Sequence, residues 1–107
     1  MRAISEFRQQ KQNVLYMSFS INKFGFSGFE ATLQYDSCEM VEETIKAICA
    51  VHKTDGNIAA CILKDAQDLG RSYGYDQDGV LMDICFFYRD TDNNRNPVRL
   101  EQGKRYD

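Results

Sequence analysis

The sequence predicts a two-layer α+β domain, a sandwich in which an antiparallel sheet of about three to four strands carries two consecutive helices on one face, in the order ββααβ. Three patterns predict this fold class. Residues 14–35 contain two runs in which apolar and polar side chains alternate, residues 41–73 contain two apolar stripes of helical spacing, and residues 80–88 alternate again.

Two strands are predicted within residues 14–35. In the first, the odd-numbered apolar residues are Leu15, Met17, Phe19 and Ile21, and the even-numbered ones are Tyr16, Ser18 and Ser20. In the second, the two sets are Phe29, Ala31, Leu33 and Tyr35, and Glu30, Thr32 and Gln34. A period of two gives each strand one buried face and one outer face. Gly25 and Gly28 favour an antiparallel hairpin with a long loop or with a bulge near Ser27 and Gly28.

Two helices are predicted next. Asp36 or Ser37 can cap the first, which should end near Lys53 because Gly56 follows. Its apolar stripe consists of Val41, Ile45, Ile48, Cys49 and His52. Asn57 can cap the second helix, which should end at Gly70 or Gly74. Its stripe consists of Ile58, Ile62, Ala66, Leu69 and Tyr73.

A third strand should follow the turn signal of Asp78 and Gly79. One of its faces consists of Val80, Met82, Ile84, Phe86 and Tyr88, and the other of Leu81, Asp83, Cys85, Phe87 and Arg89. Residues 98–100 fit a short edge strand. The helices should cover the apolar face of this sheet, and its outer face should carry Tyr16 and Phe87 among polar side chains.

The composition indicates a small acidic globular protein. The chain has 107 residues, 43% of them hydrophobic, and one proline, so we expect a single domain over 1–107 with frayed ends at 1–12 and 101–107. Charged residues interrupt the apolar ones near the N-terminus, and no apolar run is long enough for a membrane span. We therefore expect no signal peptide, no membrane association and a cytoplasmic location.

The charge is distributed unevenly. Residues 54–92 contain eight aspartates against three basic residues, whereas the tail after Asp92 contains four basic residues against two acidic ones. An acidic body argues against broad phosphate binding by the folded part. A partner protein with a basic surface is the natural complement.

Cysteine and histidine could support catalysis or metal binding. His52 follows Cys49 by three residues on the same helix, but a nucleophilic thiol must be exposed and Cys49 lies on the apolar stripe.

The four cysteines form no C-x-x-C pair, which indicates reduced thiols and does not match the spacing of a zinc knuckle. Four cysteines also allow a two-disulfide framework. The run 76–79 lacks the terminal ligands of a calcium loop. We predict no catalytic set, metal or cofactor, and keep a thiol- or zinc-dependent enzyme as an alternative.

Residues 22–29 resemble the RNP1 motif of RNA recognition motif domains, with matches at Phe24, Gly25, Phe26 and Phe29. Residues 15–17 faintly resemble the companion RNP2 motif. The resemblance implies that Tyr16, Phe24 and Phe26 stack on unpaired bases. That family separates the two motifs by a helix and a strand, whereas they are adjacent here. Single-stranded nucleic-acid binding by an aromatic platform is therefore kept as an alternative function.

The leading hypothesis is a non-enzymatic inhibitor, adaptor or regulatory subunit that docks on another protein. Phe24 and Phe26 are out of phase with the flanking apolar faces, so they are either tucked under the helices by a bulge or exposed for contact. The candidate partner-binding residues are Phe24, Phe26, Tyr73, Tyr75, Phe87 and Tyr16. Self-association through an exposed strand edge is compatible with every one of these functions.

Overall fold

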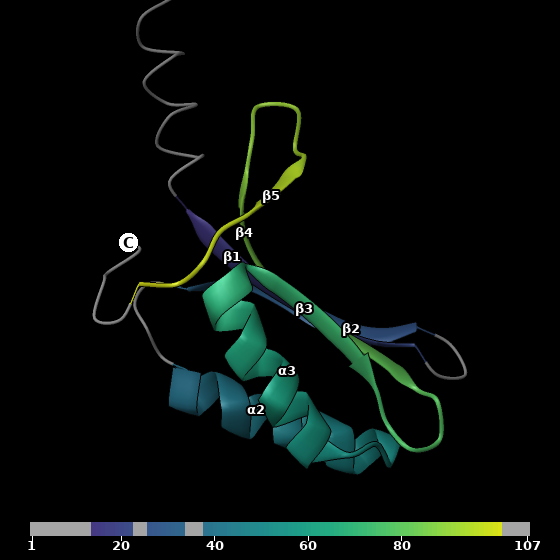
Figure 1. Ribbon diagram of the computed structural model, residues 1–107. Coiled ribbons are helices and arrows are strands. Elements are labelled where there is room, and N and C mark those ends of the chain that lie inside the picture. Colours follow the sequence, from purple (N-terminus) through teal and green to yellow (C-terminus); the bar gives the residue numbers. More distant parts are fainter. Residues whose placement is uncertain (1–13, 23–25, 34–37, 102–107) are drawn as a thin grey trace, which may run out of the picture.

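The computed structural model describes residues 14–22, 26–33 and 38–101. Its elements are β1 (Leu15–Asn22), β2 (Phe26–Leu33), α2 (Cys38–His52), α3 (Gly56–Leu69), β3 (Arg71–Tyr75), β4 (Leu81–Arg89) and β5 (Arg95–Pro97). The predicted α+β class and the succession of two strands, two helices and further strands are confirmed (Figure 1). The sheet has five strands where three to four were predicted, because β3 joins it in addition to the predicted ones.

The sheet is antiparallel, with the strand order β2-β1-β4-β3. β5 pairs with residues 87–89 of β4, on the stretch beyond the one that pairs with β3. The central strand β1 pairs along its whole length with both β2 and β4. Both helices lie on the same side of this sheet (Figure 1).

The core lies between the sheet and the helices. Its strand residues are Leu15, Met17, Phe19, Ile21, Leu33, Met82, Ile84 and Phe86, and its helix residues include Val41, Ile45, Cys49, Ile62 and Ala66. The inner face predicted from the alternation is thus confirmed, with two differences on the edge strand β2. Phe29 is only partly buried and Ala31 is exposed, because an edge strand has a neighbour on one side only.

The start of α3 differs from the prediction, whereas its end agrees with one of the two predicted positions, Gly70 or Gly74. The carboxylate of Asp55, not Asn57, caps the helix by accepting N–H bonds from Asn57 at 2.9 Å and Ile58 at 3.3 Å. The helix ends at Gly70, whose φ of 88° favours glycine. The predicted continuation of the stripe is wrong: Leu69 is 72% exposed and Tyr73 belongs to β3.

The β1–β2 hairpin contains no bulge in its described part. The pairing runs without interruption from Leu15 opposite Leu33 to Asn22 opposite Phe26, so the bulge near Ser27 and Gly28, one of the two expected alternatives, is absent. The last strand is displaced as well, since β5 covers Arg95–Pro97 instead of residues 98–100. The predicted caps Asp36 and Ser37 and the outer-face residue Gln34 lie outside the described residues.

Candidate binding surface

The second face of the sheet is not covered by α2 or α3 (Figure 1). We call it the outer face. The strand register places the even-numbered residues of β1 and β2 on it, together with the odd-numbered residues of β3 and β4. Tyr16 thus lies opposite Thr32 on one side and Phe87 on the other, and Ser18 lies between Glu30 and Cys85. This confirms the predicted outer face for its described residues.

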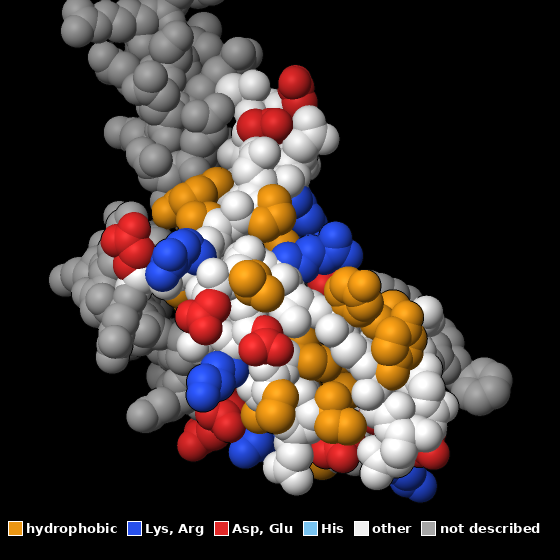
Figure 2. All heavy atoms as spheres, in the orientation of Figure 1, with side chains coloured by type: hydrophobic (Ala, Val, Ile, Leu, Met, Phe, Trp, Pro, Cys, Tyr) orange, Lys and Arg blue, Asp and Glu red, His pale blue; other side chains and the backbone are white. Residues whose placement is uncertain are grey.

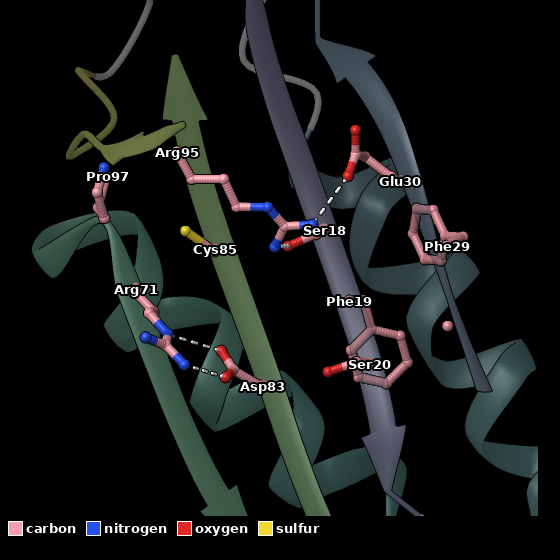
Figure 3. Close-up of a pocket in the computed structure, with 11 residues that line it drawn as sticks. Ser18, Phe19, Ser20, Phe29, Glu30, Arg71, Asp83, Cys85, Arg95 and Pro97 are labelled. Carbon is pink, nitrogen blue, oxygen red and sulfur yellow. Dashed lines mark hydrogen bonds and ion pairs between the residues drawn. The ribbon is translucent and has the colours of Figure 1, made fainter. Parts of the chain in front are cut away.

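A hollow of about 480 Å³ lies in the middle of the outer face (Figure 3). Its centre is built from small residues on neighbouring strands, namely Ser18, Ser20, Gly28 and Cys85. Gly28 permits the close approach of β1 and β2, because a Cβ atom there would overlap the carbonyl oxygen of Phe19. The absence of long side chains at these positions leaves room above the sheet.

Arg71 and Asp83 form one wall of the hollow (Figure 3). Nε of Arg71 donates to Oδ1 of Asp83 at 3.2 Å, and Nη2 donates to Oδ2 at 2.6 Å. These two parallel bonds raise the pKa of Arg71. The Arg71 side chain is still 59% exposed, so the remaining part of the guanidinium faces solvent.

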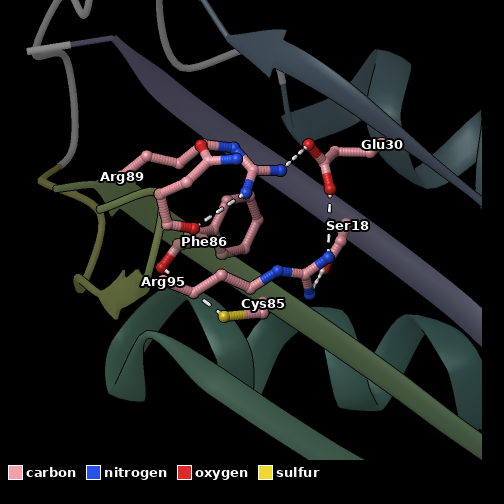
Figure 4. A network of polar contacts seen from close by, with 7 residues as sticks. Ser18, Glu30, Cys85, Phe86, Arg89 and Arg95 are labelled. Atoms are coloured by element: carbon pink, nitrogen blue, oxygen red, sulfur yellow. Dashed lines mark hydrogen bonds and ion pairs between the residues drawn. The ribbon is translucent and has the colours of Figure 1, made fainter. Parts of the chain in front are cut away.

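Arg95 and Glu30 line the opposite side of the hollow, and Arg89 shares the Glu30 carboxylate with Arg95 (Figure 4). Glu30 is shared: Arg89 pairs with its Oε1, and Nη2 of Arg95 donates to its Oε2 at 3.0 Å. Nη1 of Arg95 also donates to the hydroxyl of Ser18 at 3.3 Å. One carboxylate therefore holds two guanidinium groups, one on β4 and one on β5.

An aromatic stack supports these arginines. The rings of Tyr16 and Phe87 lie 5.6 Å apart at an angle of 17°. The guanidinium carbon of Arg89 lies 5.0 Å from the Tyr16 ring centre, and that of Arg95 lies 4.7 Å from the Phe87 ring centre. Phe87 is fully buried although it faces away from the helices. Its ring therefore supports the arginines and offers no surface of its own.

Two exposed tyrosines continue the outer face along the edge strand β3. Tyr73 is 64% exposed and Tyr75 is 59% exposed. They share this face with Arg71, opposite Asp83 and Leu81 of β4. Figure 2 shows basic and hydrophobic side chains next to one another on this side of the molecule. Tyrosine and arginine are the residue types that are enriched at protein interfaces.

Two of the described thiols, those of Cys49 and Cys85, are buried, whereas that of Cys61 is exposed. Burial raises the pKa of Cys49, and it raises the pKa of Cys85 against the opposing effect of Arg71 and Arg95. Both thiols are thus protonated at neutral pH and shielded from substrates. Cys49 lies in the core and His52 in the last turn of α2.

Metal ligands do not gather in the part of the chain that the structure describes: no group of three His, Cys, Asp or Glu side chains could hold an ion there. The carboxylate of Asp76 is used in the β3–β4 turn, where it accepts N–H bonds from Asp78 and Val80, each at 2.9 Å. The Asp76–Gly79 segment is therefore a turn, as predicted.

The structure brings four of the six predicted contact residues to one face, namely Tyr16, Tyr73, Tyr75 and Phe87. Phe24 and the side chain of Phe26 lie outside what the structure describes, and the backbone of Phe26 pairs with Asn22. Sequence reasoning missed the arginines around the hollow. The outer-face position of Glu30 and Asp83 could have predicted them, because carboxylates within a sheet are stabilised by cationic side chains on neighbouring strands.

Comparison with known proteins does not indicate a function, so a function can be inferred only from the fold and the outer face. No protein-family model, curated protein or solved structure matches the chain. Among the described helices, none is long and apolar enough to cross a membrane.

Proposed function

We propose that this α+β protein is a non-enzymatic binding protein, an inhibitor, adaptor or regulatory subunit, that docks on another protein through the outer face. One observation carries the proposal: Tyr73 and Tyr75 are exposed beside a hollow lined with arginines, on a face that the helices leave uncovered. Exposed aromatic rings on a rigid strand lose little conformational freedom on binding, and they supply most of the contact energy at many interfaces.

The charges on the helical side and on the outer face indicate which kind of partner each side suits. The sequence of α2 contains three glutamates against one lysine, and that of α3 two aspartates against one lysine. A basic partner therefore suits the helical side of the protein. The ion pairs of the outer face, by contrast, join Arg71, Arg89 and Arg95 to Glu30 and Asp83. A partner that docks on the outer face is better matched by acidic groups.

Paired variants test the proposal. The tagged protein is used to capture its partner from cells of its source, with Tyr73→Ser/Tyr75→Ser as the test variant. Val51→Ser/Leu69→Ser is the matched control, because these helix residues are 77% and 72% exposed and thus equally accessible. We expect one protein to be retained by the wild type and the control and lost from the tyrosine variant. Equal retention by both variants would contradict docking through this face.

Single-stranded nucleic-acid binding is a second candidate, because exposed tyrosines beside arginines on a sheet can also stack on bases. The net charge of −3 disfavours it. A fluorescence titration with single-stranded DNA of about 16 nucleotides at low salt tests whether the protein binds nucleic acid. Tight binding that weakens steeply with salt and requires Tyr73 would favour this candidate over a protein partner.

A further inference from the structure

We infer that the edge of β2 that faces away from β1, called here the β2 edge, is the interface of a homodimer. The β2 strands of two copies pair antiparallel and join the two sheets into one. This surface is separate from the outer face and does not depend on the proposed function. Among the described strands, β2 pairs only with β1, whereas β3 and β5 both border β4 at the other end of the sheet. The β2 edge therefore presents backbone N–H and C=O groups that can pair with another strand.

The two edges of the sheet differ in the features that prevent strand pairing. Edge strands are usually protected by short length, by charged side chains, above all lysine, by proline or by a bulge. The opposite edge has several of these features, since β3 has five residues and begins with Arg71, and β5 has three residues that include Arg95 and Pro97. β2 has eight residues, FSGFEATL, with no basic residue and no proline, and its pairing with β1 contains no bulge. Of the two edges, the β2 edge is thus the one suited to pairing.

The one charged residue of β2 is neutralised within its own copy. Glu30 pairs with Arg89 and with Arg95, the latter at 3.0 Å. Figure 3 shows the Glu30 side chain directed towards β1 and Arg95, and so away from the β2 edge. Glu30 therefore does not repel an approaching strand as an unpaired carboxylate would.

The inner side of β2 carries apolar surface that the helices do not cover. Ala31 is exposed and Phe29 is only partly buried, although both lie on the face of the sheet that packs against the helices. The Phe29 ring has one aromatic neighbour, Phe19 of β1, at a ring-centre distance of 6.2 Å. A strand paired with the β2 edge would cover Ala31 and give Phe29 a neighbour on its other side. Burial of these two side chains would favour association.

The sequence of β2 selects a register for two identical strands. Copies that keep their helices on the same side of the joint sheet place residues of the same parity opposite one another. With Phe29 opposite Phe29 of the second copy, Glu30 lies opposite Gly28 and Ala31 opposite Ser27. This register forms an aromatic pair at the twofold axis and keeps the two carboxylates apart. A register centred on Glu30 would place them directly opposite each other, which is destabilising, and one centred on Ala31 would pair fewer residues. A second copy is therefore complementary to the β2 edge in both shape and charge.

Sedimentation velocity over a concentration series tests the association. We expect the mass to rise from 12.4 kDa towards twice this value as the protein concentration increases. A mass that stays at that of one chain up to about 1 mM would overturn the inference.

Isotope-filtered NOE spectroscopy on a mixture of labelled and unlabelled protein tests the register. We expect contacts between the backbone of Gly28 in one copy and that of Glu30 in the other. Contacts between the Glu30 backbones of the two copies, or contacts from β3 alone, would contradict the proposed pairing. This measurement uses the wild type and so does not depend on the folding of a variant.

Two lysine substitutions sharpen the test. Ala31→Lys places a charge at the β2 edge on a side chain that is exposed in the single copy, and should weaken the dimer at least about tenfold. Ala47→Lys makes the same change at an exposed alanine of α2 and should leave the dimer unchanged. Circular dichroism checks that both variants keep the fold. Equal effects of the two substitutions on the dimer would overturn the inference.

The dimer and the proposed function can be tested separately. Tyr73→Ser/Tyr75→Ser should form the dimer as the wild type does, because both tyrosines lie on the opposite edge strand. Loss of the dimer in this variant would place the contact on β3 and overturn the inference. Dimer formation requires no partner protein, so the sedimentation experiment can succeed while the capture experiment fails, and the reverse.

Discussion

Replacing Phe87 with alanine should destabilise the protein as much as a mutation in the core between sheet and helices. Phe87 lies on the outer face, yet its exposed fraction is 0%, the same as that of Phe86 on the inner face. Removing a fully buried phenylalanine ring costs about 3–5 kcal/mol. Most of this comes from burial, and the stack on Tyr16 contributes about 0.5–1.5 kcal/mol of it.

Urea denaturation monitored by circular dichroism measures this cost. Phe86→Ala serves as the core reference, with an expected loss of about 3–5 kcal/mol in the free energy of unfolding. Tyr75→Ala serves as the exposed reference, with an expected change within about 0.5 kcal/mol. Phe87→Leu should fall between them, at less than about 1.5 kcal/mol. A loss of unfolding free energy below about 1 kcal/mol for Phe87→Ala would mean that the stack of Tyr16 and Phe87 is not formed in solution. The Phe87 ring would then not support Arg95 beside the hollow.

Three further predictions follow from single sites. Alkylation at neutral pH with mass-spectrometric detection should modify the exposed Cys61 well before the buried Cys49 and Cys85, whose pKa values are raised; early labelling of Cys85 would contradict its burial. Gly28→Ala should cost about 1–3 kcal/mol in urea denaturation, because the new Cβ would overlap the carbonyl of Phe19; an unchanged stability would contradict the close approach of β1 and β2. Hydrogen bonds from Asn94 lower the pKa of Asp90, so the turn between β4 and β5 gains stability from its carboxylate at neutral pH and loses it as the pH falls through that lowered pKa; an NMR titration that finds an ordinary pKa would refute this.

Local periodicity was sufficient to predict which residues face the helices. The alternation in β1 and β4 depends only on the period of an extended chain, and it correctly assigned Phe19 to the core and Ser18 to the outer face. The same local logic failed at β3. Tyr73 follows Leu69 at helical spacing, so the pattern counted Tyr73 in the helical stripe and left the helix end open between Gly70 and Gly74. Residues 71–75 instead form a hairpin with β4 across the short turn at Asp76, and the helical spacing of apolar residues does not reveal such a pairing.

The hollow could not be predicted for a related reason. Its two arginines come from different strands, namely Arg71 on β3 and Arg95 on β5, and Arg89 of β4 shares the carboxylate that pairs with Arg95. They meet because β3 and β5 pair with successive stretches of β4. The sequence analysis did not predict β3 and placed the last strand at residues 98–100 instead of Arg95–Pro97, so it left Glu30 and Asp83 without their cationic partners. The exposed Tyr73 and Tyr75 were identified from composition and the neighbouring glycine alone.

Site-specific photo-crosslinking tests the central claim, docking of a protein partner on the outer face, most directly. A photoreactive phenylalanine derivative replaces Tyr73 on the outer face in one variant and Val51 on the helical side in another; both positions are well exposed, at 64% and 77%. Irradiation in source cells should give a discrete crosslinked protein from position 73 and none from position 51. Crosslinking from position 51 alone would place the partner on the helices and contradict the proposed role of the outer face.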